Sequence, residues 1–251
     1  MITFLWFIFF STTMIQLGYW LFVFSKLAFH APPPPDTLAK APQHKVSVII
    51  CAHNEAKNLQ KNLPKILEQD YPEFEVIVVN DNSSDKTLDV LLDFKKKYPT
   101  LCVINRTYKM SHEVGKKFAL AQGIETAQHE LLLLTDADCQ PSTNQWLAQM
   151  QNKIAPPIAI VLGYGPYFNY KEDGFLNRFI RFETVYTAIQ YFSFALWGKP
   201  YMGVGRNLMY KKTLYRKVNG FKSHEHVASG DDDLFINAIA HLNNTIINLD
   251  E

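Results

Sequence analysis

Cysteine, net charge and glycine-rich phosphate loops are all scarce in this sequence, and each scarcity excludes a class of protein. The 251 residues include three cysteines, Cys51, Cys102 and Cys139, which lie far apart in strand-like runs. Neither a disulfide framework nor a zinc site is therefore expected, and we interpret them as reduced core residues in a cytosolic compartment. The formal net charge is +1, which gives no electrostatic reason to expect nucleic acid as a partner.

Glycine motifs that bind phosphate are also missing. No Gly-x-Gly-x-x-Gly follows the first expected strand, and no Gly-Lys-Ser of the Walker type occurs. A dinucleotide site or a P-loop is therefore not supported.

Charged side chains are absent from the first 25 residues. This stretch is long enough to cross a hydrocarbon layer, which requires about 20 apolar residues. A cleavable signal peptide would begin with basic residues and end with small ones, and neither feature is present. We predict a membrane anchor over residues 1–29. A buried core helix is the alternative, but the apolar character runs all round the helix.

The positive charges nearest to this stretch are Lys26, Lys40 and Lys45, which all follow it. The positive-inside rule then places the rest of the chain in the cytoplasm, at a bacterial inner (plasma) membrane. Residues 30–45 contain APPPPD, which predicts a stiff proline-rich linker between the anchor and the following domain.

Strand and helix patterns alternate from residue 45 onward. Helical spacing over 56–70 is interrupted by Pro64, which argues against an unbroken helix. We expect strands within 45–55, 74–85, 101–107, 130–138 and 158–163, and helices within 56–70, 86–98 and 115–127. This alternation predicts an α/β fold whose sheet is mostly parallel, with right-handed crossovers and a ligand site at the carboxyl ends of the strands.

Three of the expected strands end in polar loops that would share one edge of the sheet: His53–Glu55, Asp81–Asn82 and Asp136–Asp138. Turn-forming residues follow strands for conformational reasons alone, but several acids on one rim repel one another unless a cation neutralises them. If the chain stays extended through Ala137, the two aspartates beside it point the same way. Carboxylate oxygens suit Mg²⁺ or Mn²⁺, so we predict a metal that holds a diphosphate.

In combination, six stretches resemble the family 2 glycosyltransferases, which have the GT-A fold. They are VSVIICAHNEAKNL, VIVVNDNSSDKT, GKKFALAQGI, LLLLTDADCQP, GVGRNLMYKKTLYRKVNGF and SGDDDLFINAI, in the order of the family. The resemblance extends from Val46 to about Ala240. It implies a Rossmann-like, mostly parallel sheet flanked by helices, in a catalytic domain over residues 46–251 that follows one transmembrane helix.

The same resemblance implies roles for particular residues. Asp138 would be the main metal ligand with Asp136 beside it, and Asn207 would border the donor sugar and the acceptor. Taken from the residues alone, Lys116 could be a solvated helix residue. Contacts to the nucleotide sugar would come from Ala52, Asn54, Glu55, Asp81, Lys116 and Asp136.

Three adjacent acids, Asp231, Asp232 and Asp233, precede an apolar helical run. Acids at a helix start favour the macrodipole and cap free amides, which is one explanation. The other is that an acceptor hydroxyl needs a carboxylate within hydrogen-bond reach to take its proton. The family pattern makes Asp231 the base when it is aligned on Asp233-Leu234, and Asp232 when it is aligned on the acid pair. We prefer Asp231 and keep both as candidate catalytic residues.

The second half of the chain leaves several alternatives open. The aromatic residues between 163 and 201 could form core, or one helix face could lie at the membrane interface or line an acceptor groove. The imidazoles of His224 and His226 could lie together, but no third metal ligand is evident and a surface loop is favoured. The Gln-x-x-Arg-Trp motif of processive members is absent, and the end of the sequence resembles the start of another strand. We therefore expect a longer protein with further acceptor-site residues and membrane spans.

The sequence as a whole predicts a membrane-anchored enzyme that transfers a sugar from a UDP-linked nucleotide sugar to a glycan or lipid acceptor. The transfer would invert the anomeric carbon and require Mg²⁺ or Mn²⁺. One alternative is a nucleotidyltransferase, which would have a glycine-rich, basic first loop. The other is a non-catalytic sugar-nucleotide-binding membrane protein, which would not need the acids around Asp231.

Overall fold

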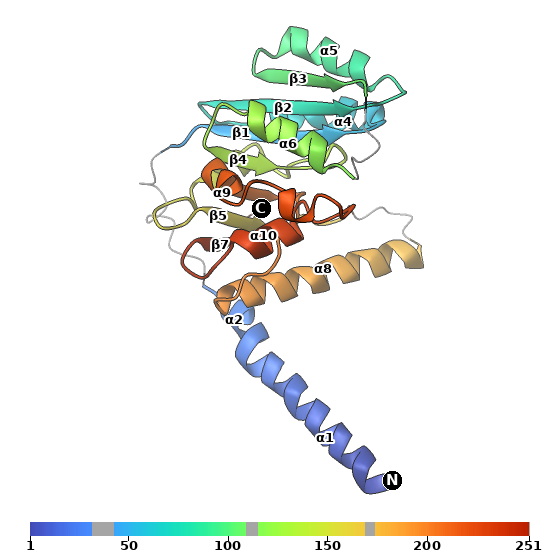
Figure 1. The fold of residues 1–251 in the computed structure, drawn as a ribbon, viewed down its shortest axis with the longest axis vertical. Helices are drawn as coiled ribbons and strands as arrows, with labels where there is room; N and C mark the ends of the chain where they lie inside the picture. The colour runs from blue at the N-terminus through green and yellow to red at the C-terminus, as the bar shows by residue number, and fades with distance from the viewer. Residues whose placement is uncertain (32–42, 109–114, 169–173, 251) are drawn as a thin grey trace.

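The computed structural model describes residues 1–31, 43–108, 115–168 and 174–250. Within these residues a seven-stranded sheet carries helices on both faces (Figure 1). Most of the predicted proline-rich linker, residues 32–42, lies outside the described residues.

The sheet has the strand order β3-β2-β1-β4-β6-β5-β7. β6 runs antiparallel to β4 and β5, while the other paired strands are parallel. The prediction of a mostly parallel sheet is therefore confirmed, and β6 is a strand that the sequence analysis missed. The strands are β1 (Val46–Ala52), β2 (Phe74–Asp81), β3 (Leu101–Arg106), β4 (Leu131–Leu134), β5 (Ile160–Gly163), β6 (Leu208–Lys211) and β7 (Thr245–Asn248).

Helices follow the first three strands in the alternating order that the patterns predict. The domain contains α4 (Ala56–Leu67), α5 (Thr87–Lys97), α6 (Lys117–Thr126), α7 (Trp146–Gln151), α8 (Phe175–Leu196), α9 (Lys212–Lys217), the 3₁₀ turn η2 (Lys222–His224) and α10 (Asp233–Ile239). The expected interruption at Pro64 is wrong, because α4 runs through it. Proline removes the donor to the carbonyl of Gln60, which is an exposed residue, and the carbonyl of Pro64 still accepts from the amide of Glu68 at 2.9 Å.

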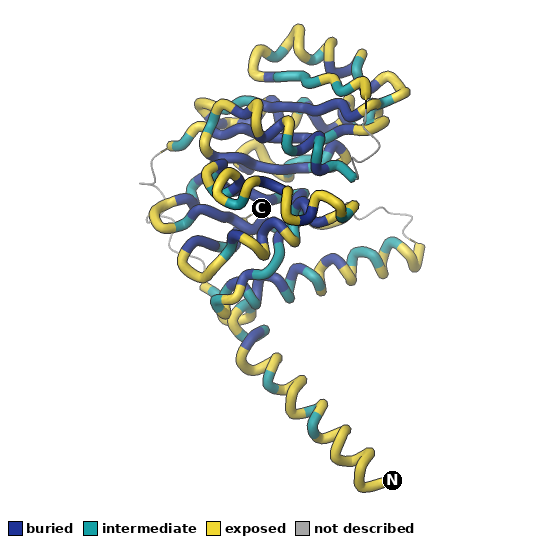
Figure 2. The backbone as a smooth tube through the Cα atoms, viewed as in Figure 1, coloured by how far each residue is buried: buried dark blue, intermediate teal, exposed yellow. Residues whose placement is uncertain are grey.

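Two hydrophobic clusters form the core, one on each face of the sheet. Alternate residues of β1 point to opposite faces: Val48 and Ile50 belong to the cluster beneath α4, α5 and α7, and Ile49 belongs to the cluster beneath α6, α8 and α10. Gly123 allows α6 to approach closely, since an added Cβ would lie 2.7 Å from a methyl carbon of Ile49. Figure 2 shows the buried strands in the middle of the domain.

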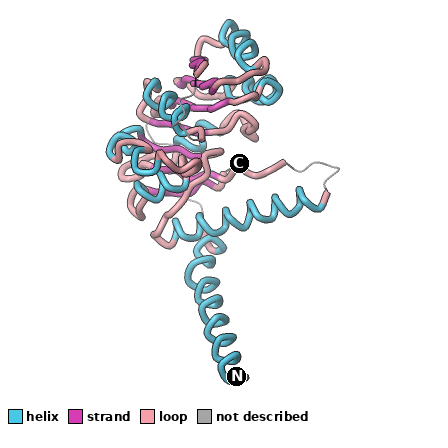
Figure 3. Tube along the Cα trace, turned by 45° about the vertical axis from the view of Figure 1, so that its right-hand side comes forward, coloured by secondary structure: helices cyan, strands magenta, loops and turns pink. Residues whose placement is uncertain are grey.

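A long apolar helix precedes the domain. It consists of α1 (Ile2–Gly18), the π-helical stretch η1 (Tyr19–Phe24) and α2 (Ser25–Ala28). Figures 2 and 3 show that it projects away from the sheet, and Figure 2 shows that it is exposed along most of its length. Over Ile2–Ala28 it is long and apolar enough to cross a membrane, with a mean hydropathy of 1.6. The alternative of a buried core helix is wrong, because only 6% of its most apolar stretch is buried.

The aromatic residues of α8 divide between core and surface. Tyr191 and Phe192, in its second half, are buried in the domain core. Phe175 and Phe182, in its first half, are 85% and 66% exposed. The core alternative therefore applies to the second half of α8, whereas the first half carries its aromatic rings at the surface.

Candidate active site

The candidate site lies along the edge of the sheet where β1, β2 and β4 end. Ala52, which is 1% exposed, closes β1 in register with Asn80 of β2. Leu134 closes β4 in register with Ile49 of β1. The loops that follow these three strands therefore leave the sheet at one edge, as the parallel arrangement predicts.

The loops after β1 and β2 are tied together by polar contacts. Asn54 has a left-handed backbone with φ of 58°. Its Oδ1 accepts from the backbone amide of Ser84 at 2.8 Å, and its own backbone amide donates to the hydroxyl of Ser83 at 2.9 Å. His53 Nδ1 lies 2.6 Å from the carbonyl oxygen of Asp81. The side chain of Asn54 thus acts as a tie between the two loops.

Glu55 lies at the start of α4 and is also held in place. Its amide donates to the hydroxyl of Thr87 at 2.8 Å, and its Oε2 accepts from the side-chain amide of Asn58 at 2.6 Å. These contacts orient the carboxylate at the mouth of the β1 loop, where the resemblance places nucleotide contacts.

Asp81 forms an ion pair that the sequence analysis missed. Its carboxylate accepts from a guanidinium nitrogen of Arg106 at 2.8 Å, and the two side chains are only 11% and 10% exposed. The residues are register partners at the ends of β2 and β3. The signal in the sequence was an arginine as the last residue of a strand adjacent to the acid, but the strand register was needed to use it.

The segment Asp136–Cys139 forms a turn, and the expectation that the chain stays extended through Ala137 is wrong. The amide of Cys139 donates to the carbonyl of Asp136 at 3.1 Å, which closes the turn. The carbonyl of Ala137 is held by the side-chain amide of Asn62 at 3.1 Å, and Ala137 is buried. The turn nevertheless brings the ligand atoms of Asp136, Asp138 and Cys139 within 4.8 Å of one another.

This group suits a hard divalent cation bound through its carboxylates. Asp138 is exposed and Asp136 is half-buried, so both oxygens can meet a ligand from solvent. Burial raises the pKa of the Cys139 thiol to about 12, which keeps it protonated and unsuited to metal binding. Two carboxylates with water and phosphate oxygens form the ligand set that Mg²⁺ or Mn²⁺ prefers.

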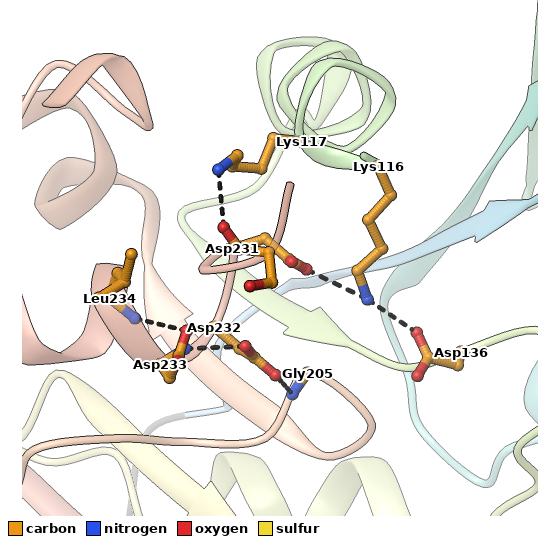
Figure 4. Close-up of polar contacts among 9 residues, drawn as sticks. Lys116, Lys117, Asp136, Gly205, Asp231, Asp232, Asp233 and Leu234 are labelled. Carbon is orange, nitrogen blue, oxygen red and sulfur yellow. Dashed lines mark hydrogen bonds and ion pairs between the residues drawn. The ribbon is translucent and has the colours of Figure 1, made fainter. Parts of the chain in front are cut away.

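Lys116, at the amino end of α6, connects this group to the acid-rich segment (Figure 4). Its ammonium lies 3.2 Å from Asp136 Oδ1 and 3.1 Å from Asp231 Oδ2. Burial by itself would lower the pKa of Lys116, but the two carboxylates outweigh it and raise the pKa above its ordinary value. The lysine is therefore fully charged at neutral pH, and it brings together residues that the resemblance assigns to the donor and to the acceptor.

Lys117, the next residue, serves the loop before Asp231 and was missed in the sequence. It is 1% exposed, and its ammonium donates to the carbonyls of His224 at 2.6 Å, of Ser229 at 2.8 Å and also of Val227. The signal available in the sequence was its spacing, because Lys117 shares a helix face with the core residues Leu120 and Ile124. Lys117 thus clamps residues 224–229.

The three adjacent acids have different partners (Figure 4). Asp232 accepts from the amide of Gly205 at 2.9 Å through one oxygen and from the amide of Asp233 at 2.8 Å through the other. Asp233 accepts from the amide of Leu234 at 2.8 Å. Burial raises the pKa of Asp232, and the hydrogen bond from the amide of Gly205 offsets only part of this rise. Asp232 and Asp233 therefore accept the backbone amides at the start of α10, whereas Asp231 forms an ion pair with Lys116.

Asn207 lies outside this network. Its Oδ1 accepts from the indole of Trp146 at 3.0 Å, and its side-chain amide donates to the carbonyl of Tyr164 at 2.9 Å. Both ends of the side chain are thus used to join α7, the end of β5 and the loop before β6. The nearer part of that loop is Gly205, where an added Cβ would lie 3.5 Å from Asp232.

His224 and His226 do not form a metal site in the described part of the chain, where neither belongs to a group of three potential ligands. His224, the first residue of the clamped loop, is buried, and His226 is exposed. Burial, followed by the nearby charge of Lys117, lowers the pKa of His224 below its ordinary 6.5. The predicted surface loop therefore has one buried imidazole.

Residues 47–218 match a family described as Glycosyl transferase family 2. A relative of known sequence, the poly-beta-1,6-N-acetyl-D-glucosamine synthase of Staphylococcus epidermidis, is 36% identical over 96 residues, which are 37% of this chain and 21% of that protein. The chain spans less than half the length of the curated relatives it matches.

Two solved structures have the same fold. The mannosyltransferase PcManGT from Pyrobaculum calidifontis, in complex with GDP-Man and Mn²⁺, gives a TM-score of 0.64 at 22% identity, over 84% of this chain and 59% of that one. TarS 1-349 from S. aureus, in complex with UDP-GlcNAc, gives 0.56 at 20% identity, over 82% of this chain and 56% of that one. The seven-stranded, mostly parallel sheet is thus of the GT-A type.

Proposed function

The chain belongs to glycosyl transferase family 2, and from this membership we propose that it transfers a sugar from a nucleoside diphosphate sugar to a glycan or lipid acceptor. The observation that carries the proposal is the contact of one ammonium, that of Lys116, with Asp136 at 3.2 Å and Asp231 at 3.1 Å. A donor diphosphate beside Asp136 and an acceptor hydroxyl beside Asp231 would meet at this lysine.

Asp231 is the proposed general base. The hydroxyl oxygen of the acceptor attacks the anomeric carbon while its proton passes to the Asp231 carboxylate. The new carbon–oxygen bond forms as the bond from the anomeric carbon to the diphosphate oxygen breaks, so a single displacement inverts the anomeric centre. Both oxygens of Asp232 already accept backbone amides, which favours Asp231 for this role.

Lys116 and the two carboxylates of the turn after β4 are proposed to hold the diphosphate. A divalent metal bound to Asp138 and Asp136 would supply positive charge to the leaving group. Lys116 adds a positive charge 3.2 Å from Asp136 Oδ1, and its raised pKa keeps that charge through neutral pH. The Mn²⁺ in the mannosyltransferase complex supports this assignment.

We propose UDP as the nucleotide. The complex of TarS with UDP-GlcNAc supports it, whereas the complex of the mannosyltransferase with GDP-Man makes GDP the competing choice. Asp81 and Glu55, at the ends of the first two strands, are the proposed contacts to ribose and base, with Ala52 and Asn54 shaping the first loop.

The helix Ile2–Ala28 is the proposed membrane anchor, with the catalytic domain in the cytoplasm at the inner (plasma) membrane. Its length of 27 residues and mean hydropathy of 1.6 support a span. The positive charge of Lys26, near the carboxyl end of this helix, supports the cytoplasmic orientation. Recovery of the full-length protein in the soluble fraction without detergent would contradict the anchor. N-terminal sequencing that shows the first residues to have been removed would also contradict it.

The test of the function is donor binding followed by transfer. Calorimetry of the full chain in detergent should show UDP binding tighter than GDP binding in Mn²⁺, and loss of binding in a chelator. Asp138→Asn should lose most of the metal-dependent binding, because it removes the exposed carboxylate of the turn.

A matched control is Asp93→Asn on α5, which removes another exposed carboxylate, one paired with Lys96 at 2.9 Å. It should leave binding unchanged. Transfer is then measured with labelled UDP-sugars and GDP-sugars on membrane extracts that supply glycan and lipid acceptors. Equal nucleotide affinity in metal and in chelator would remove the metal from the proposal. Nucleotide binding without transfer of any sugar would leave a binding protein instead of an enzyme.

A further inference from the structure

α8 carries a row of exposed aromatic side chains along its first half. Phe175, Phe179, Phe182 and Tyr186 are 85%, 54%, 66% and 46% exposed. They are spaced by four, three and four residues, so they line one side of a helix with 3.6 residues per turn. We refer to these four residues as the aromatic stripe.

The stripe points away from the domain. The residues that α8 buries nearest to it, Thr184, Ala188 and Tyr191, repeat with the same helical spacing on the opposite side of the helix. Of these, Ala188 and Tyr191 pack into the core cluster of the sheet. The stripe therefore has its back to the core and faces outward.

The rings of the stripe are paired and have apolar neighbours. Phe175 and Phe179 stack at 6.4 Å between centroids, and Phe182 and Tyr186 stack at 6.1 Å. Leu176, 69% exposed, is a further exposed apolar residue in the first turn of α8. A contiguous exposed apolar patch of this kind marks an interaction surface for a protein or a membrane.

The N-terminal helix decides between these two partners. η1 and α2 pack against α8, and the ring of Tyr19 lies 6.3 Å from that of Phe194 near the carboxyl end of α8. Ser193 lies two turns beyond Tyr186 on the same side of α8 as the aromatic stripe, and it is fully buried. The side of α8 that carries the stripe is therefore covered at this end of the helix. Figures 1 and 3 both show the N-terminal helix leaving α8 on the side away from the sheet. The candidate span and the stripe thus lie on the same side of α8.

Side chains typical of a membrane–water interface gather where the two helices meet. Tyr19 and Trp20 are 43% and 55% exposed near the end of the span. Trp197 and Lys199 follow α8, with the ammonium 4.9 Å from the indole centroid. Tyrosine and tryptophan concentrate at the level of the headgroups. Because α8 runs crosswise to α1 from this junction (Figure 1), it extends along that level.

We propose that α8 lies in the membrane–water interface with the aromatic stripe inserted at the boundary of headgroups and acyl chains. The proposal rests on the membrane anchor of the proposed function and adds a second attachment, which fixes the orientation of the domain on the lipid surface. α8 also forms a wall of a cavity of about 160 Å³ that reaches Arg206, next to Gly205. The acceptor side of the candidate site would therefore lie close to the lipid.

The test measures the depth of single side chains in vesicles of phosphatidylethanolamine and phosphatidylglycerol. The full chain carries Phe182→Cys, labelled with an environment-sensitive fluorophore, and quenching by nitroxide lipids is recorded. Burial raises the pKa of Cys51 to about 12 and that of Cys139 likewise to about 12, which limits their labelling. Cys102→Ala completes the background, and this parent without Phe182→Cys serves as the labelling blank.

Two matched positions serve as controls. Leu92, which is 44% exposed on α5 at the far end of the domain (Figure 1), provides Leu92→Cys as the water-facing reference. Ile8, in α1, provides Ile8→Cys as the membrane reference. We expect lipid quenching at position 182 several-fold above that at position 92 and comparable with that at position 8.

Each remaining outcome overturns the proposal in a different way. Quenching at position 8 but not at position 182 would refute the interfacial helix and leave the anchor and the sugar transfer intact. A label at position 182 could instead be shielded from aqueous iodide without being quenched by nitroxide lipids, with the shielding increasing at higher protein concentration. That result would assign the stripe to a contact with a second copy of the chain. Absence of quenching at positions 8 and 182 would refute the anchor as well, without bearing on nucleotide binding.

Discussion

The same substitution at two adjacent lysines at the start of α6 should impair two different properties of the protein. Lys117→Met removes an ammonium that is 1% exposed and donates to three backbone carbonyls. Methionine retains most of the buried stem, so the change isolates the charge and its hydrogen bonds. We expect Lys117→Met to destabilise the domain and Lys116→Met to impair donor binding.

The magnitude for Lys117→Met follows from its contacts. A hydrogen bond from a charged donor contributes about 1.5–3 kcal/mol, and a carbonyl left buried without a partner costs about 1–3 kcal/mol. The variant recovers part of this, because the ammonium is no longer desolvated. Desolvation is the main cause of the lowered pKa of Lys117. We expect a net loss of about 3 kcal/mol in the free energy of unfolding.

Function should change with stability, but in a specific way. The clamped residues 224–229 lead directly into Asp231. A loosened loop would displace the proposed base while leaving the donor contacts at the strand ends in place. Turnover by Lys117→Met should therefore fall more than the affinity for the nucleotide. The assay combines urea unfolding of the full chain in detergent, calorimetry of UDP binding, and initial rates of transfer.

Lys116→Met is the matched control. Its side chain is 40% exposed, and its pair with Asp136 contributes at most about 1 kcal/mol to stability, but its loss also leaves the buried carboxylate of Asp231 without a cation. It should lose diphosphate affinity and destabilise the domain less than Lys117→Met does. Wild-type stability and turnover in Lys117→Met would refute the clamp. A large loss of stability in Lys116→Met would show that the two lysines share a structural role.

Three further predictions concern charged groups around the site. Asp231→Asn should reduce transfer by about 10²- to 10⁴-fold with little change in UDP affinity, whereas Asp232→Asn should act mainly by destabilising the start of α10; steady-state rates and thermal unfolding separate the two, and a normal rate in Asp231→Asn would move the base elsewhere. Arg106→Gln should lower the free energy of unfolding by about 3 kcal/mol, since it leaves the buried carboxylate of Asp81 unpaired; a double-mutant cycle with Asp81→Asn should recover part of the loss, and strict additivity would argue against the pair. The lowered pKa of His224 means that the unfolded chain binds its proton more readily than the folded chain does. Stability should therefore fall as the pH drops from about 6.5 toward the lower folded pKa, and His224→Phe should flatten that part of the pH profile of urea unfolding.

Local pattern was sufficient for the alternation of β1 to β4 with α4 to α6 and for the edge that carries the site. The apolar run Leu131–Leu134 predicted a strand buried on both faces, and it is one. Strand and helix alternation predicted a parallel sheet, and the carboxyl ends of parallel strands must share an edge. The loops containing Asn54, Asp81 and Asp136 were therefore expected together without any knowledge of their contacts.

Contacts between distant residues were decided only by the folded structure. The pairing of Asp81 with Arg106 required the register of β2 and β3, and the different fates of Lys116 and Lys117 required the position of the loop that follows η2. The hydrogen bonds of the Asn207 side chain to Trp146 and Tyr164 likewise join residues far apart in sequence.

The membrane-facing surface shows the same division. The sequence by itself determined that residues 1–25 carry no charge and that α8 is rich in aromatics. Which aromatics are buried depended on how much of the helix the sheet covers, and that is set by packing: Tyr191 lies over the core, and Phe175 extends beyond it. Periodicity records which residues share a helix face, because that depends only on neighbours along the chain. What covers that face depends on elements far away in sequence, which meet it only after the chain has folded.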